Sequence, residues 1–132
     1  MLLDIRKLED IAPAFVSAKS QHVDALMVGV DALTQQYRLL IAKLAADQHL
    51  PAIYVSKEYT DAGGLIAYGP SYPDLYRRAA IYVDKIFRGV SPSDLPVEQP
   101  TKFELIINLQ AAKTLGLTVP LIMQMTADEV IE

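Results

Sequence analysis

The sequence predicts an α/β domain whose strands form a parallel sheet built from βαβ layers. Short, continuously apolar runs rich in β-branched residues recur along the chain, as strands of a parallel sheet do. Segments with helical periodicity lie between these runs, and short connections join them, which favours right-handed crossover units. The 132 residues are enough to bury roughly two thirds of the unfolded chain's surface, so we expect one well-packed core.

The apolar runs give the expected strands, in chain order. They are residues 25–30 (ALMVGV), 51–55, 65–68 and 103–108, with residues 2–5 as a candidate fifth. The run at 25–30 has no polar residue, which indicates a strand buried on both faces of the sheet.

Three helices are expected between the strands. The first begins near Asp10, because Pro13 is tolerated only in a first turn. The third runs from Asp74 to Arg88 and ends at Gly89, a residue suited to the left-handed conformation after a helix. The second helix is indicated by an apolar stripe formed by Leu33, Tyr37, Leu40, Ile41 and Leu44.

A proline-rich segment interrupts this alternation. Residues 89–102 (GVSPSDLPVEQPTK) have no periodicity, so we expect an extended connector that carries the chain from one lobe to another. Gly63 and Gly64 lie before the next strand, where a backbone with positive φ explains them better than phosphate binding does.

Composition excludes several functions. The net charge of −4 and a pI near 5.1 argue against a nucleic-acid partner, which needs a basic surface. There is no cysteine, and His22 and His49 have no partners at metal-ligand spacing, so no metal site is expected. The chain lacks phosphate-binding and dinucleotide motifs and the serine-nucleophile elbow, so we expect no cofactor, no catalytic residue and no enzyme activity.

The sequence indicates neither a membrane span nor an export signal. No apolar run approaches the length of a membrane span. The opening residues MLLDIRKLED carry charge within the first four positions, so the chain as written is expected to have no export signal.

Polar residues follow three of the expected strands. They begin at Asp31, at Ser56 and at Tyr68, and ligands of open parallel sheets meet the loops at the carboxyl ends of strands. Helix capping is the alternative role for Asp31 and Asp74, and packing is the alternative for the tyrosines. An ion pair within one helix explains the arginines that follow Asp74.

The second half of the chain resembles a known family. The segments AGGLIAYGP, DLYRRAA, VDKI, DLPVEQPTKFEL and AAKTLGL follow one another in residues 62–117, and residues 24–54 fit the preceding βαβ unit. In these segments the chain is similar to the C-terminal part of ABC-transporter solute-binding proteins, in the group that includes tryptophan- and tyrosine-binding lipoproteins. The resemblance implies a type I periplasmic-binding fold, of which this chain holds mostly the second lobe.

The resemblance also implies how the chain is divided. Residues 1–72 would be a partial second lobe, residues 73–89 a helix that packs with the first lobe, and residues 90–132 the connector and the return to the second lobe. The first lobe, together with the opening strand and helix of the second, is expected to be missing from this truncated chain.

Function, partners and site follow from the same resemblance. The chain would capture a small solute such as an aromatic amino acid by lobe closure and deliver it to an ABC permease, in a periplasmic or membrane-anchored location. Tyr68 or Tyr72 could stack on an aromatic solute. The residues expected to line the cleft are Asp31, Ala32, Ser56, Lys57, Tyr68, Gly69, Ser71, Tyr72 and Asp74.

A second hypothesis is that the same lobe serves as an interaction domain without a role in transport. A truncated sheet exposes a strand edge and an apolar helix face, which favours a homodimer or a domain swap. The alternative is therefore a dimeric sensor or interaction domain.

Overall fold

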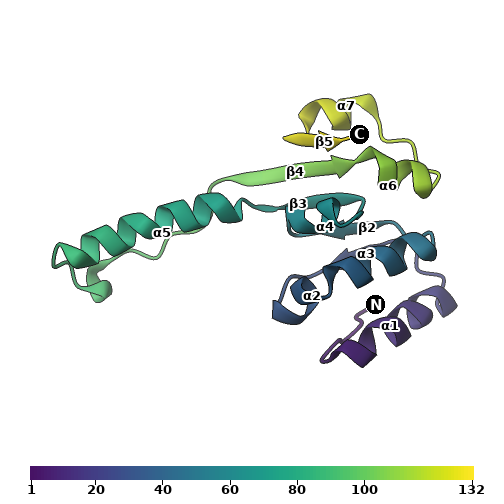
Figure 1. Cartoon of the computed structure of the whole chain (residues 1–132), viewed down its shortest axis with the longest axis horizontal. Coiled ribbons are helices and arrows are strands. Elements are labelled where there is room, and N and C mark those ends of the chain that lie inside the picture. The colour runs from purple at the N-terminus through teal and green to yellow at the C-terminus, as the bar shows by residue number, and fades with distance from the viewer. The chain divides into compact units, whose positions relative to one another are not determined.

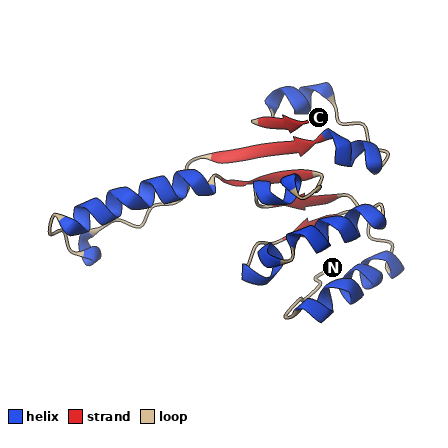
Figure 2. Cartoon of the chain, viewed as in Figure 1, coloured by secondary structure: helices blue, strands red, loops and turns tan.

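The computed structural model describes all 132 residues. The chain forms two compact units, of which the first joins Met1–Gly69 to Glu104–Glu132 and the second is Pro70–Phe103. Figure 1 follows the chain through both units, and Figure 2 separates their helices from their strands. The division into lobes that the sequence resemblance implies remains a prediction for these two units.

A five-stranded sheet forms the centre of the first unit. Its strands are adjacent in chain order (Figure 1), and the pairs β1–β2, β2–β3 and β4–β5 are parallel. This confirms the α/β class with a mostly parallel sheet. Strand β4 runs antiparallel to β3, because the Asn108 N–H at its end donates to the carbonyl oxygen of Leu65, just before β3. The strands are β1 (Leu26–Val28), β2 (Ala52–Tyr54), β3 (Ile66–Pro70), β4 (Phe103–Asn108) and β5 (Glu129–Ile131).

Helices connect the strands of this unit. They are α1 (Leu8–Ser20), α2 (Ala32–Gln36), α3 (Arg38–Asp47), α4 (Lys57–Asp61), α6 (Leu109–Thr114) and α7 (Leu121–Thr126). None of the helices in the chain combines the length and the apolar character that crossing a bilayer requires.

The start of α1 differs from the prediction. The helix begins at Leu8 rather than near Asp10, and Pro13 lies inside it. The Asp10 carboxylate accepts hydrogen bonds from the backbone N–H groups of Arg6 (3.0 Å) and Lys7 (3.1 Å), so Asp10 caps the first turn from within the helix.

The apolar stripe that begins at Leu33 spans two helices. Tyr37 has φ −100° and ψ 21°, outside the helical region, so α2 ends and α3 begins at this residue. The Arg38 guanidinium donates to the Gln35 carbonyl oxygen (3.1 Å), which satisfies one of the acceptors that the break leaves open.

Strand β1 is buried on one face only, which corrects the prediction of a strand covered on both faces. Leu26 and Val28 pack against the core, whereas the Met27 side chain is 79% exposed. Its neighbour in register, Ile53 of β2, is also exposed. No helix covers this part of the sheet face. Residues 2–5 form no strand, and the fifth strand is β5 instead, at the other edge of the sheet.

The core lies between the sheet and helices α1, α3 and α4. Tyr54 and Tyr59 stack within it, with ring centroids 4.5 Å apart. Gly63 has the expected positive φ of 95°. Gly64 is required for space instead, because an added β-carbon would lie 2.5 Å from the Tyr54 ring. The buried core residues are Ile11, Phe15, Ala18, Ile41, Ala45, Leu50, Ala52, Tyr54, Tyr59, Ala67 and Ile106.

The second unit is a helix with an extended return. Helix α5 (Tyr72–Phe87) ends before Gly89, which has φ 95° as expected for a residue after a helix. A short 3₁₀ turn (Pro92–Asp94) and an extended segment then run back along α5, so the connector is extended as predicted. The Tyr82 hydroxyl donates to the Pro96 carbonyl oxygen (2.8 Å) and holds the two together.

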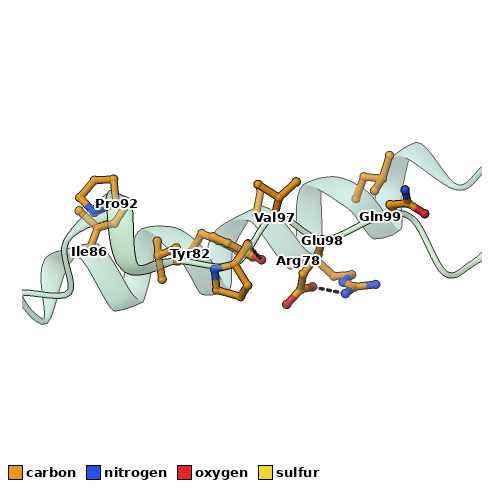
Figure 3. Close-up of a pocket in the computed structure, with 11 residues that line it drawn as sticks. Arg78, Tyr82, Ile86, Pro92, Val97, Glu98 and Gln99 are labelled. Atoms are coloured by element: carbon orange, nitrogen blue, oxygen red, sulfur yellow. Dashed lines mark hydrogen bonds and ion pairs between the residues drawn. The ribbon is translucent and has the colours of Figure 1, made fainter.

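Helix α5 has two apolar faces. One face lines a cavity of about 490 Å³ against the return segment, with Leu75, Ala79, Tyr82 and Ile86 contributing (Figure 3). The other face carries Tyr76, Val83 and Phe87, which are exposed; Phe87 is 86% exposed. The return segment therefore covers one side of the helix only partly and leaves the other side open, and no residue of α5 is fully buried.

Candidate functional site

Two helices begin where neighbouring parallel strands of the first unit end. Asp31 follows β1 as the N-cap of α2, and Ser56 follows β2 as the N-cap of α4. In parallel sheets these loops form the edge where ligands meet the fold. The candidate site is this carboxyl edge.

Asp31 caps helix α2, which is the alternative role that the sequence suggested for it. Its carboxylate accepts from the Thr34 backbone N–H (2.8 Å), and the Thr34 hydroxyl accepts from the Asp31 N–H (3.0 Å). This reciprocal arrangement fixes the first turn of α2. Asp31 and Ala32 both remain exposed, so capping does not remove the carboxylate from solvent. Asp31 also lines a cavity of about 470 Å³ beside β1.

Ser56 ties the loop after β2 to α2. It is buried, and its hydroxyl donates to the side-chain oxygen of Gln35 at 3.3 Å. The contact joins the loop after β2 to the helix that follows β1. Gln35 was not predicted from the sequence, because it is 21 residues from Ser56 and only the folded sheet brings them together.

Lys57 is engaged in two ion pairs. Its ammonium lies 2.6 Å from the Glu129 carboxylate on β5 and 3.1 Å from the Asp61 carboxylate. The hydrogen bond to Glu129 raises the pKa of Lys57, although partial burial opposes it. Glu129 is therefore part of the tertiary structure, and its neighbour Asp128 accepts from the Leu105 N–H (2.8 Å).

Tyr68 and Gly69 are consecutive on β3 and differ in exposure. The Tyr68 side chain is 54% exposed. Gly69 is buried where β3 passes Val55, and an added β-carbon would lie 1.9 Å from the Val55 carbonyl oxygen. Close approach of the strands accounts for glycine at this position.

The remaining predicted residues belong to the second unit. Ser71 is buried as the N-cap of α5, and its backbone N–H donates to the Lys102 carbonyl oxygen (3.0 Å). Tyr72 is half-buried in the first turn. Asp74 pairs with Arg77 at 2.9 Å, the ion pair expected within this helix.

Asn108 is a structural residue that sequence reasoning missed, and it lies at the opposite edge of the sheet, where its backbone N–H donates to the Leu65 carbonyl oxygen (2.9 Å) just before β3 begins. Its side-chain oxygen accepts from the Ala111 N–H (2.9 Å), and its side-chain nitrogen donates to the Thr60 carbonyl oxygen (3.0 Å). It is buried and links α6 to α4. An asparagine that directly follows an apolar run and precedes a helix was the signal that could have identified it.

The chemistry of the edge suits binding. The chain contains no cluster of three or more acidic or histidine side chains that could hold a metal ion. The Tyr59 hydroxyl is buried without a hydrogen-bond partner, and burial raises its pKa, so it stays protonated. His22 and His49, far apart in sequence, line one surface cavity with Lys19, Asp24 and Gln48. They are exposed and do not belong to the carboxyl edge.

Comparisons with known proteins agree with this architecture. The sequence pattern of the family described as ABC transporter substrate binding protein matches residues 1–131. No curated protein matches the chain.

Three solved structures share the fold. A conserved domain protein from Vibrio cholerae has a TM-score of 0.86 and 23% identity over 94% of this chain and 42% of its own. An ABC domain from Streptococcus pneumonia, in complex with L-Trp, has a TM-score of 0.88 and 23% identity over 96% and 43%. A ligand-free, open substrate binding protein with adhesive properties from Clostridium difficile has a TM-score of 0.65 and 23% identity over 97% and 42%. The chain thus spans about two fifths of each.

Proposed function

Because the chain belongs to the ABC transporter substrate binding protein family, we propose that it is part of a solute-binding component that delivers a small solute to an ABC permease. The family match over residues 1–131 is the observation that carries this proposal. The chemistry of the carboxyl edge supports binding without covalent catalysis, since its charged groups are engaged in caps and ion pairs. A periplasmic or membrane-anchored location follows from the same role.

The solute we propose is an amino acid, and an aromatic one is the first to test. A protein of the same fold is described in complex with L-Trp. In this chain, the side chain of Tyr68 on β3 is 54% exposed and offers an aromatic face. The next residue, Gly69, lies where β3 closely approaches Val55. Stacking on such a face contributes about 0.5–1.5 kcal/mol beyond buried area.

Solute capture would work by closure around the bound molecule. Asp31, Ala32, Ser56 and Lys57 would contribute from the loops after β1 and β2. Gly69, Ser71, Tyr72 and Asp74 would contribute from the segment that leaves β3. Exposed Asp31 is the acceptor best placed for a solute ammonium group, because its capping bonds leave the carboxylate accessible.

Calorimetric titration with L-tryptophan, L-tyrosine and glycine tests the proposal. We expect the aromatic amino acids to bind and the Tyr68→Ala variant to lose at least tenfold in affinity. Tyr76→Ala is the matched control, since Tyr76 is also exposed but lies outside the proposed site. Equal losses in both variants, or no binding of any amino acid to the wild-type chain, would argue against the proposed solute.

A dimeric interaction domain is the second candidate, favoured by the open apolar face of α5. Tyr76, Val83 and Phe87 form a stripe at helical spacing with exposed fractions of 77%, 48% and 86%. Sedimentation at micromolar concentration tests it. A dimer that Phe87→Glu converts to a monomer supports this reading, and a monomeric wild-type chain excludes it.

A further inference from the structure

A slot runs along the open edge of the sheet. It has a volume of about 470 Å³ and lies between β1 and the N-terminal segment. Strand β1 is the first in the sheet order, so no strand pairs with its outer side. The wall is mostly apolar, because buried Phe15 and Ile41 line it together with half-buried Val23; three polar residues, Asp4, Asp31 and Thr34, also contribute to the lining. The segment that forms its far side comprises residues 1–5, of which Leu3 and Ile5 pack against the core.

The backbone of β1 presents open hydrogen-bonding groups to this slot. Leu26 donates its N–H to the Pro51 carbonyl oxygen at 2.8 Å, in the direction of β2. Adjacent residues of a strand direct their N–H and C=O groups to opposite sides, so Met27 directs both groups away from β2. The N–H and C=O of Met27 therefore face the slot.

The size of the slot matches one strand. Within a sheet, a residue occupies about 4.8 Å between strands, about 3.3 Å along the strand and about 10 Å between packed layers, or roughly 160 Å³. A volume of about 470 Å³ therefore accommodates roughly three residues, which is the length of β1. A bound strand of this length would continue the sheet by one position.

The faces of the sheet indicate the kind of strand that fits. On the core side the slot is lined by Phe15, Val23 and Ile41. On the other side, Met27 and Ile53 are exposed although both are apolar. Strands of parallel sheets carry apolar residues on both faces. The strand that fits is therefore apolar on both sides, with no charged residue in its centre.

We propose that this slot is an acceptor for a β-strand: an extended, apolar peptide segment from outside these 132 residues inserts between β1 and residues 1–5 and pairs with Met27. The open edge, the apolar wall and the matching volume each point to the same occupant. The solved structures that share this fold are more than twice as long as this chain, so proteins of this fold contain further polypeptide that could supply such a strand. Pairing of a peptide with an exposed edge is a known mode of recognition.

Amide hydrogen exchange of the intact chain tests the proposal. The probe is a synthetic peptide with the sequence of residues 25–30, ALMVGV, extended by lysines for solubility; it is apolar on both faces. Without peptide, we expect the Met27 amide to exchange rapidly and the Leu26 amide to be protected by β2. With peptide, exchange of the Met27 amide should slow at least tenfold. The same peptide methylated at its backbone nitrogens should give no protection, because the methyl groups remove its donors to the Met27 carbonyl oxygen and block the close approach of the two strands.

Two substitutions at one position separate pairing from apolar adsorption. Met27→Pro removes the N–H that faces the slot, and proline is tolerated on edge strands. Met27→Ala keeps the N–H and removes the exposed side chain. We expect Met27→Pro to weaken peptide binding at least tenfold and Met27→Ala to change it less than threefold.

Four results would overturn the proposal. The first is equal weakening by the two substitutions, and the second is equal binding of the methylated peptide. The third is protection of Met27 without peptide at every protein concentration, which would show that residues 1–5 already pair with β1. The fourth is protection that rises with protein concentration alone, which would assign the edge to a second copy of the chain.

Discussion

Replacement of Gly69 by alanine tests whether this glycine is required by the packing of two strands. The added β-carbon would lie 1.9 Å from the Val55 carbonyl oxygen, whereas ordinary contacts begin near 3.4 Å. The strands would have to separate by about 1.5 Å, the difference between these two distances, at a point where backbone faces backbone. Overpacking of this kind costs about 1–3 kcal/mol, and loss of a ladder hydrogen bond between β2 and β3 adds about 1 kcal/mol.

Urea unfolding measures this cost. We expect Gly69→Ala to lower the free energy of unfolding by about 3 kcal/mol, which moves the midpoint by about 1.5 M if the slope is about 2 kcal/mol/M. Gly29→Ala is the matched control, because an added β-carbon there meets nothing within 4 Å and its φ is not positive. We expect this variant to be as stable as the wild type or slightly more stable. If the two variants unfold at the same urea concentration, the close approach of β3 to Val55 does not constrain position 69.

The other predictions concern buried polar groups and one exposed ion pair. Tyr59→Phe removes a buried hydroxyl that has no partner, so we expect unchanged or higher stability, by up to about 1 kcal/mol; a loss above about 1 kcal/mol in thermal unfolding would reveal a hidden partner. Asn108→Ala removes a helix cap and the donor to Thr60, so the free energy of unfolding should fall by about 2 kcal/mol. Asn108→Ser keeps an acceptor for the cap and should recover about half of the lost stability. Equal losses in the two variants would exclude a capping contribution. The hydrogen bond from Arg78 lowers the pKa of Glu98, so the contact between the return segment and α5 is fully present above the ordinary Glu pKa and is lost as pH falls through the lowered value. In the Arg78→Ala variant, NMR titration should show that the Glu98 pKa returns to its ordinary range. An unchanged titration would contradict the pairing.

The sequence predicted those parts of the fold that depend on local pattern. Apolar runs identified four of the five strands, and Gly89 identified the end of α5, because both signals lie within a few consecutive residues. Strand β5 was missed because its three residues stand among acidic side chains near the end of the chain. The start of α1 was misplaced because Asp10 caps from the third helical position instead of preceding the helix.

The candidate site was less accessible to sequence reasoning, because its contacts join distant residues. Asp31 could be predicted as a cap from its position before a helix. The pairing of Lys57 with Glu129 joins residues 72 positions apart, and no local pattern reports it. The exposure of Met27 could not be predicted for a different reason. An apolar run indicates side chains whose burial would be favourable, but it does not indicate which elements of the chain cover them.

The hydrogen bond from the Ser71 N–H to the Lys102 carbonyl oxygen has a consequence for protein engineering. At 3.0 Å, it brings the start and the end of the second unit together at one point of the chain. Residues 70–103 therefore form a loop whose two ends are adjacent, and the entropic cost of closing such a loop depends only weakly on its length. A two-residue turn grafted between β3 and β4 would make the helical arm a removable module and would leave a minimal sheet domain for design.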